Sequence, residues 1–162
     1  MATATRVLSN WNQFLDGVSL STQDFYTVVE SAVRKRQVPD AEFGRVDYKM
    51  GGMFSARREY LRIKRGELVF DICGAPFGTG FFVSWWLQAT KSAWGDLFGD
   101  AAAGLFKSFV NPETFFKVDS AAMYRTIVHA AVIETVDLVL QKSGKAALSA
   151  DAKKPILEGF YQ

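Results

Sequence analysis

Residues 57–73 read RREYLRIKRGELVFDIC, and they carry the clearest structural signal in the sequence. Within residues 57–64, apolar and charged side chains alternate over the last four positions. Leu61 and Ile63 fall on one side, while Arg62 and Lys64 fall on the other. Alternation with a period of two is typical of a β-strand with one buried face. We therefore predict a strand over residues 57–64.

A tight turn follows this strand at Arg65 and Gly66. Glycine adopts positive φ without steric cost, and many two-residue hairpin turns need such a residue. Residues 67–73 then alternate again and predict the return strand of an antiparallel hairpin. Its inward side chains are expected to be Leu68, Phe70 and Ile72.

Two further apolar runs flank the hairpin and predict additional strands at residues 43–48 and 80–88. A glycine-rich loop is expected at residues 74–80, between the hairpin and the strand at residues 80–88. Consecutive strands joined by short links are typical of an antiparallel meander. The sequence therefore predicts a meander of three to four strands.

Helices are expected before and after these strands in the chain. Ser21, followed three residues later by Asp24, resembles a capping box and begins an N-terminal helix that stops before Pro39. Its buried positions are expected to be Phe25, Val28, Val29, Ala32 and Val33. A shorter helix is expected before it, at residues 9–16, from the helical spacing of Trp11, Phe14 and Leu15.

The second half of the chain is predicted to be mostly helical. One amphipathic helix is expected at residues 94–109, and a long one from Asp119 or Ser120 to just before Gly144. Ser149 is expected to cap a last short helix. The predicted fold class is α+β, with the meander packed with N-terminal and C-terminal helices in one domain, residues 1–162.

Composition excludes several classes of function. The chain has 162 residues with 19 basic and 17 acidic ones, so its net charge is too small to attract nucleic acid by itself. It has one Cys and one His, whereas a zinc site needs three or four such ligands. We therefore expect no metal and no cofactor. The start of the chain has no apolar run of signal-peptide length, which favours a cytoplasmic location.

Nucleophilic catalysis would depend on Cys73 and His129, with Asp71 or Glu134 to orient the imidazole. Nothing in the spacing of these residues matches a known catalytic motif. A free cysteine is more often a small buried hydrophobic residue. The sequence therefore predicts no catalytic residue, although a hydrolase or transferase that uses Cys73 or His129 stays as an alternative.

Basic residues are concentrated in residues 34–65, which hold ten of them against four acidic residues, a net charge of +6. Such a surface has three interpretations: a solvated sheet face, a contact with anionic lipid or an acidic protein, or an RNA-binding module. The candidate electrostatic partner contacts are Arg34, Lys35, Arg36, Arg57, Arg58, Arg62, Lys64 and Arg65.

Aromatic residues are concentrated between residues 77 and 116. Core packing accounts for most of them, since core helices and strands have the same periodicity. Exposed members of the block would instead supply an apolar contact to a membrane interface or a hydrophobic partner. The candidates for that contact are Trp94, Phe98 and Phe109.

Two blocks of the sequence resemble a family of uncharacterised bacterial proteins. The first contains REYLRI, LVFDIC and APFGTGFFVSWWL, up to residue 87. The second contains VHAAV and LSADAKKPIL, at residues 128–132 and 148–157. Other members have apolar, membrane-spanning segments between the blocks, so the resemblance implies proximity to a membrane. It implies no catalytic residue.

These observations together favour a non-enzymatic accessory or structural subunit. We expect it to lie peripherally on the cytoplasmic face of a membrane protein complex, of which an energy-transducing complex is one candidate. The basic segment would meet anionic groups, and the aromatic block would supply the apolar contact. The alternatives are the Cys73 or His129 enzyme and an RNA-binding module that uses residues 34–65.

Overall fold

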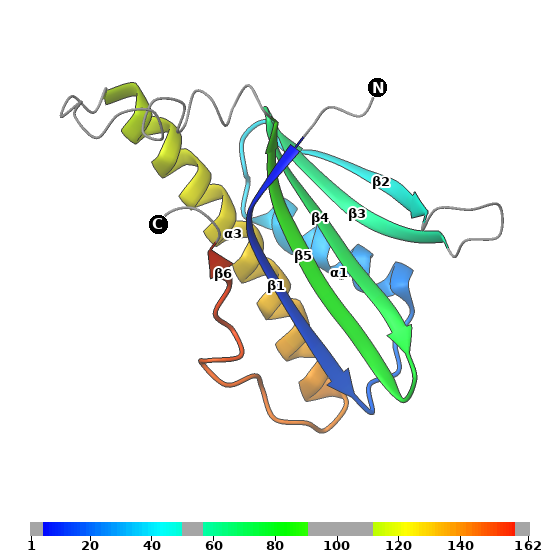
Figure 1. The fold of residues 1–162 in the computed structure, drawn as a ribbon. Coiled ribbons are helices and arrows are strands. Elements are labelled where there is room, and N and C mark those ends of the chain that lie inside the picture. Colours follow the sequence, from blue (N-terminus) through cyan, green and yellow to red (C-terminus); the bar gives the residue numbers. More distant parts are fainter. Residues whose placement is uncertain (1–4, 50–56, 91–111, 158–162) are drawn as a thin grey trace.

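The computed structural model describes residues 5–49, 57–90 and 112–157. In chain order its elements are β1 (Thr5–Asp16), α1 (Thr22–Lys35), β2 (Glu42–Lys49), β3 (Arg57–Arg65), β4 (Leu68–Phe77), β5 (Gly80–Thr90), α3 (Pro112–Lys142) and β6 (Ile156–Leu157). The strands form one antiparallel sheet in the order β2-β3-β4-β5-β1-β6 (Figure 1). The predicted α+β class is confirmed. The predicted meander corresponds to β2–β5, and the sheet as a whole has more strands than expected.

The hairpin of β3 and β4 forms as its alternation predicts. Arg65 and Leu68 are paired and flank a two-residue turn that starts at Gly66. Gly66 has φ of +57°, a region that residues with a Cβ rarely adopt. The turn therefore forms one residue later than predicted, at Gly66 and Glu67, and the inward face is confirmed because Phe70 and Ile72 are fully buried.

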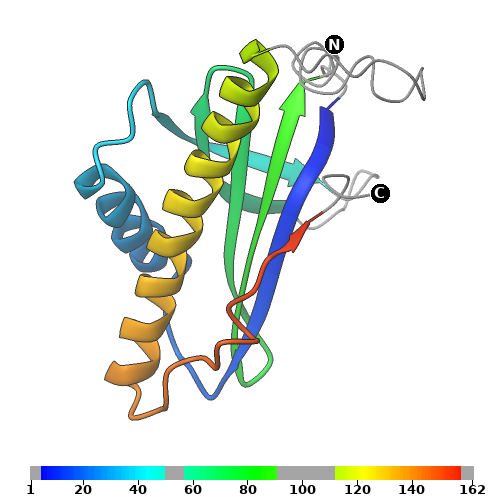
Figure 2. The same cartoon turned by 90° about the vertical axis from the view of Figure 1, so that its left-hand side faces the viewer.

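The described helices pack on the same face of the sheet, and the opposite face carries no described helix (Figures 1 and 2). The core lies between the sheet and the helices. At its centre the ring of Phe70 makes edge-to-face contacts with Trp85 and Tyr124, with 5.2 Å between ring centroids in each case. Burying each such side chain stabilises the fold by about 1.5–3 kcal/mol.

Helix α1 begins where the sequence predicts. The Ser21 hydroxyl accepts a hydrogen bond from the backbone N–H of Asp24 at 3.0 Å, which confirms the N-cap. Its buried face differs by one position, because Tyr26 is buried and Val28 is exposed. Tyr26 is tolerated in the core because its hydroxyl donates to the carbonyl of Glu59 at 2.6 Å.

The helix predicted at residues 9–16 is wrong, because these residues belong to strand β1. Trp11 and Leu15 face the helices and are buried, as a helical spacing also permits. Phe14 discriminates between the two structures, since it lies opposite Phe82 on the other face of the sheet and is exposed. Eight register pairs with β5 satisfy the backbone of residues 9–16, which a short isolated helix would leave exposed.

The predicted glycine-rich loop is also shorter than expected. Strand β4 continues to Phe77 and β5 begins at Gly80, so only a two-residue turn joins them. Gly74 lies inside β4. A Cβ at this position would come within 2.3 Å of the Phe25 ring, so only glycine fits without a shift. Glycine at this position therefore permits close packing of α1 on the sheet.

Helix α3 begins at Pro112, earlier than Asp119 or Ser120, and ends before Gly144 as predicted. Gly144 has φ of +69°, and the N–H of Lys145 donates to the carbonyl of Leu140 at 2.9 Å, as in a Schellman motif. The last helix predicted from Ser149 is wrong, since that region forms a turn followed by β6. The helix predicted at residues 94–109 lies outside the described residues.

Candidate functional site

The face of the sheet opposite the helices, which we call the open face, is the most distinctive surface among the described residues. Strand alternation selects its side chains. Asp71 is paired with Arg62 on β3 and with Trp86 on β5, so all three side chains lie on this face. The open face contains Phe14, Tyr48, Arg58, Tyr60, Arg62, Lys64, Asp71, Cys73, Phe82, Ser84, Trp86 and Gln88.

A polar network occupies the centre of the open face. The carboxylate of Asp71, only 1% exposed, accepts two hydrogen bonds from Arg62: Nε donates to Oδ1 at 2.7 Å and a terminal nitrogen to Oδ2 at 2.8 Å. The hydroxyl of Tyr48 donates to Oδ2 at 2.6 Å, and the amide of Gln88 donates to the same oxygen at 3.0 Å. A bidentate arginine–carboxylate pair is among the stronger charge-assisted contacts.

The network fixes the charge and direction of its members. Hydrogen bonding to Asp71 raises the pKa of Arg62, so the guanidinium stays protonated. Burial, followed by the hydrogen bond to Asp71, raises the pKa of the Tyr48 hydroxyl. A buried carboxylate is costly unless every oxygen is satisfied. Here it holds Arg62 and Tyr48 in fixed positions at the surface, a preorganised arrangement that suits binding.

Exposed aromatic rings lie on the open face, with Tyr48 in the network, Trp86 beside Asp71 and Phe14 farther along the sheet. Tyr48, Trp86 and Phe14 are each 40–43% exposed although they belong to regular strands. The rings of Tyr48 and Tyr60 meet edge to face with 5.1 Å between their centroids. Trp, Tyr and Arg are the residue types that dominate protein–protein binding energies. The open face therefore has the composition of an interface centre.

The basic residues singled out in the sequence divide between the two sides of the sheet. Arg58, Arg62 and Lys64 lie on the open face, whereas Arg57 and Arg65 alternate to the other side. The remaining three, on α1 or just after it, belong to the helix layer. They are Arg34, Lys35 and Arg36.

Several of these cations already have partners. Arg34 forms an ion pair with Glu30 at 2.7 Å and covers the ring of Phe43. Arg36 forms an ion pair with Glu134 on α3, which joins the two helices. Arg65 donates to a backbone carbonyl, that of Pro39, at 3.1 Å. The structure therefore does not bring the eight basic residues together into one patch. Trp94, Phe98 and Phe109 lie outside the described residues.

Cys73 and His129 lie on opposite faces of the sheet. Cys73 lies opposite Ser84 on the open face and is buried, which raises the pKa of its thiol. His129 lies on the helix side, where its Nδ1 accepts a hydrogen bond from the indole of Trp85 at 3.1 Å. The two side chains therefore cannot act as one nucleophile–base pair in this arrangement.

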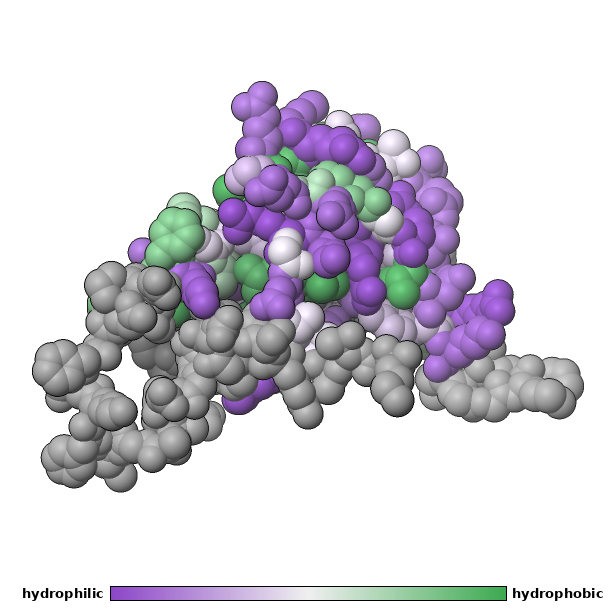
Figure 3. All heavy atoms as spheres, turned by 90° about the horizontal axis from the view of Figure 1, so that it is seen from above, coloured by the Kyte–Doolittle hydropathy of each residue, from purple (hydrophilic) through white to green (hydrophobic). Residues whose placement is uncertain are grey.

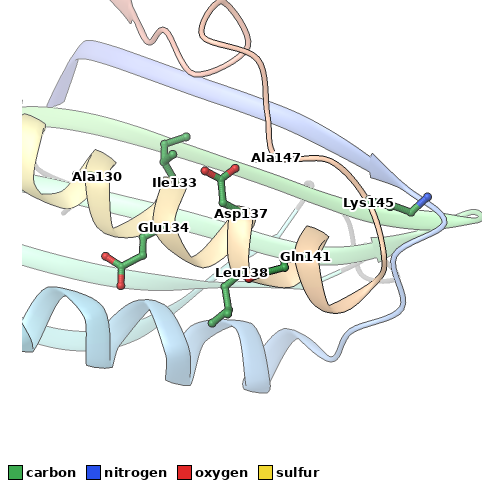
Figure 4. Close-up of a pocket in the computed structure, with 8 residues that line it drawn as sticks. All are labelled: Ala130, Ile133, Glu134, Asp137, Leu138, Gln141, Lys145 and Ala147. Carbon is green, nitrogen blue, oxygen red and sulfur yellow. The ribbon is translucent and has the colours of Figure 1, made fainter.

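A groove of about 740 Å³ runs along the outer side of α3 (Figure 4). Glu134 and Leu138 point from α3 toward α1, and Asp137 points the other way. Asp137 is paired with Lys153 at 2.7 Å and also accepts the backbone N–H of Leu148. The charged groups of the groove thus serve contacts within the fold and do not converge on its centre.

The sequence contained a signal for the open face that the choice of Trp94, Phe98 and Phe109 missed. Trp85 and Trp86 are consecutive residues of a predicted strand, so one of them had to point away from the core. Asp71 was less accessible to such reasoning. Its hydrogen bonds come from three other strands, and register across three strands cannot be read from local alternation.

No helix within residues 5–49, 57–90 and 112–157 combines the length and hydropathy needed to cross a membrane. In the same part of the chain, no three His, Cys, Asp or Glu side chains gather as a metal site would require. Comparisons of the chain with protein-family models, with curated proteins and with solved structures find no match. The geometry of the site is therefore the main basis for a functional proposal.

Proposed function

We propose that the protein is a non-enzymatic accessory subunit that binds a partner protein through the open face of its sheet. The observation that carries the proposal is that the open face combines the exposed rings of Tyr48, Trp86 and Phe14 with an arginine held by a buried carboxylate. Exposed aromatic clusters of this kind mark interaction sites on soluble domains.

The energetics of the open face suit protein binding. Aromatic side chains supply a large contact area and lose little conformational entropy on binding, because they have only two rotatable bonds. The position of Arg62 is already set by its hydrogen bonds to Asp71, so a partner would order it at low additional cost. Sheet hydrogen bonding likewise fixes the backbone beneath the rings.

The partner in this proposal belongs to a membrane protein complex, and the protein lies on its cytoplasmic face. Support comes from the sequence resemblance and from the exposed cations of β3. Arg58 and Lys64, on the open face, would each contribute on the order of 1 kcal/mol near an anionic surface. Viewed from above, the described surface is largely hydrophilic with separated hydrophobic side chains, as suits contact with headgroups rather than insertion (Figure 3). An energy-transducing complex is one candidate host.

The test is affinity purification from native membranes, with wild type compared with Trp86→Ala and Phe116→Ala. Phe116 is a matched control because it is an exposed aromatic residue on α3, away from the open face. We expect a partner to copurify with wild type and Phe116→Ala but not with Trp86→Ala. Recovery of wild type only as a soluble monomer at low salt would contradict the proposal.

A second candidate function is binding of single-stranded RNA by the same face. The specific observation is the Tyr48–Tyr60 pair, which lies beside Arg58 on adjacent strands. Aromatic platforms next to arginine bind single strands by stacking, with affinity that falls steeply with salt. Fluorescence anisotropy with a labelled oligouridine at two salt concentrations distinguishes this candidate from a protein partner.

The hydrolase or transferase alternative has less support, since Cys73 and His129 lie on opposite faces of the sheet. Burial also raises the pKa of the Cys73 thiol and so reduces its thiolate fraction at neutral pH. We expect Cys73→Ala and His129→Ala to keep partner binding. Copurification with each variant, after circular dichroism has verified its fold, checks this expectation.

A further inference from the structure

Residues 145–157, which we call the C-terminal segment, run from the end of α3 along the edge of the sheet to β6 beside β1 (Figure 2). None of these residues is buried. The groups beneath them on β1 are buried, including Ser9 and Trp11. The C-terminal segment thus covers part of the core with no fully buried side chain, although the partly buried Leu148 packs against the core.

Three side chains hold the C-terminal segment through its backbone carbonyls. The Ser9 hydroxyl donates to the carbonyl of Ile156 at 2.6 Å, and the Trp11 indole donates to the carbonyl of Ala152 at 2.7 Å. His129 Nε2 lies 2.7 Å from the carbonyl of Lys153. Because Nδ1 of the same ring accepts from Trp85, Nε2 carries the proton and donates. Backbone carbonyls occur in any peptide, so these contacts select an extended chain rather than a sequence.

One contact does depend on side-chain chemistry. Asp137 Oδ2 pairs with the ammonium of Lys153 at 2.7 Å, while Oδ1 accepts the backbone N–H of Leu148 at 3.1 Å. The other charge pair of the segment, between Lys154 and Asp151, is internal to it and exposed. A single basic side chain is therefore what Asp137 recognises.

Strand pairing adds little to this attachment. β6 has two register pairs with the twelve-residue β1, at Ser9 and Asn10. Ile156 and Leu157 are 55% and 44% exposed, so their apolar burial is small. An edge strand that is paired over so short a stretch remains a template for an added strand.

We propose that the outer edge of β1, together with His129 and Asp137, is a binding seat for an extended peptide segment of a partner protein that carries a lysine or arginine. The C-terminal segment is its intramolecular occupant. This β1 seat is separate from the open face, so the inference does not rest on the function proposed above. A partner segment competes with an occupant present at high effective concentration, and its apparent affinity depends on how firmly that occupant is held.

The test uses the full-length protein and a fluorescein-labelled peptide SADAKKPIL, which copies residues 149–157. Lys153→Ala in the protein weakens the occupant alone, so the peptide should bind about fivefold more tightly than to wild type. Asp137→Ala removes the Lys153 pair from occupant and peptide alike, and removes the Leu148 hydrogen bond from the occupant alone, so the peptide should bind this variant no more weakly than wild type. Lys154→Ala is the matched control, because Lys154 contacts Asp151 and not the seat.

A second peptide, with alanine in place of the lysine that corresponds to Lys153, should bind wild type and Lys153→Ala about fivefold more weakly than SADAKKPIL does. Trp86→Ala should bind SADAKKPIL as wild type does, which separates this inference from the function of the open face. Absence of peptide binding to Lys153→Ala up to about 1 mM, or equal affinity for wild type and Lys153→Ala, would show that the segment is a fixed part of the fold.

Discussion

Trp85 and Trp86 are neighbours in the chain, yet they belong to two different surfaces of the same sheet. Trp85 faces the helices, is fully buried and donates a hydrogen bond to His129. Trp86 faces away from them and is 40% exposed. The comparison teaches that position in the pleat, not residue type, separates the aromatic core from the candidate binding surface.

The largest effect is expected from truncating one of these residues. Trp85→Ala removes a ring packed against Phe70 and His129 and should lower the free energy of unfolding by about 3–5 kcal/mol. Trp86→Ala removes a half-exposed ring and should cost less than about 1 kcal/mol. Urea denaturation of both variants measures the difference. Equal losses would mean that something on the open face packs against Trp86 as firmly as the core packs against Trp85.

The next effect concerns the one carboxylate that the open face buries. Asp71→Ala leaves Arg62 and Tyr48 without their shared acceptor and should lower the free energy of unfolding by roughly 2–3 kcal/mol, less than a fully buried pair because Arg62 is partly exposed. Asp151→Ala is the matched control, since its pair with Lys154 is exposed. Denaturation midpoints of the two variants should therefore differ clearly. An unchanged midpoint for Asp71→Ala would mean that the network does not contribute to the stability of the fold.

Much of the sheet could be predicted from the sequence because alternation is local. Leu61, Ile63 and the turn at Gly66 suffice to place β3 and β4, and Ser21 places the start of α1. The helix assigned to residues 9–16 failed because Trp11 and Leu15 satisfy both periodicities, and only pairing with β5 decides between them. A segment that depends on a distant partner strand cannot be assigned from its own pattern.

The candidate site was less predictable for the same reason. The basic residues were grouped by their closeness in sequence, whereas the fold sends Arg62 and Arg34 to opposite sides of the sheet. The network around Asp71 depends on the register of β2 against β3 and of β3 and β5 against β4, which is a tertiary property. The segment after α3 was assigned as helix from Ser149, although its structure is set by donors on β1 and α3.

A moderate effect is expected at the turn of the β3–β4 hairpin, whose side chains lie on both faces of the sheet. Gly66→Val forces a β-branched residue into positive φ and should lower the free energy of unfolding by about 1–2 kcal/mol. Gly44→Val on the neighbouring strand is the matched control, because its φ is ordinary and a Cβ there meets no atom within 4 Å. Thermal melts should separate the two variants. Equal melting temperatures would mean that the turn relaxes without strain.

The smallest effect is expected from the titration of His129, on the helix-covered face. Burial, opposed by the hydrogen bond to Lys153 and aided by Arg125, lowers the pKa of this imidazole below its ordinary value near 6.5. The unfolded chain then binds a proton that the folded chain does not, so stability should fall as the pH decreases from about 6.5 toward the lower folded pKa. The slope cannot exceed about 1.4 kcal/mol per pH unit for one proton.

Because Nδ1 accepts from the Trp85 indole, protonation would also oppose two donors and weaken that hydrogen bond. Denaturation at pH 7.5, 6.5 and 5.5 should show this slope in wild type and a flatter profile in His129→Gln, and identical profiles would mean that groups other than His129 set the pH dependence.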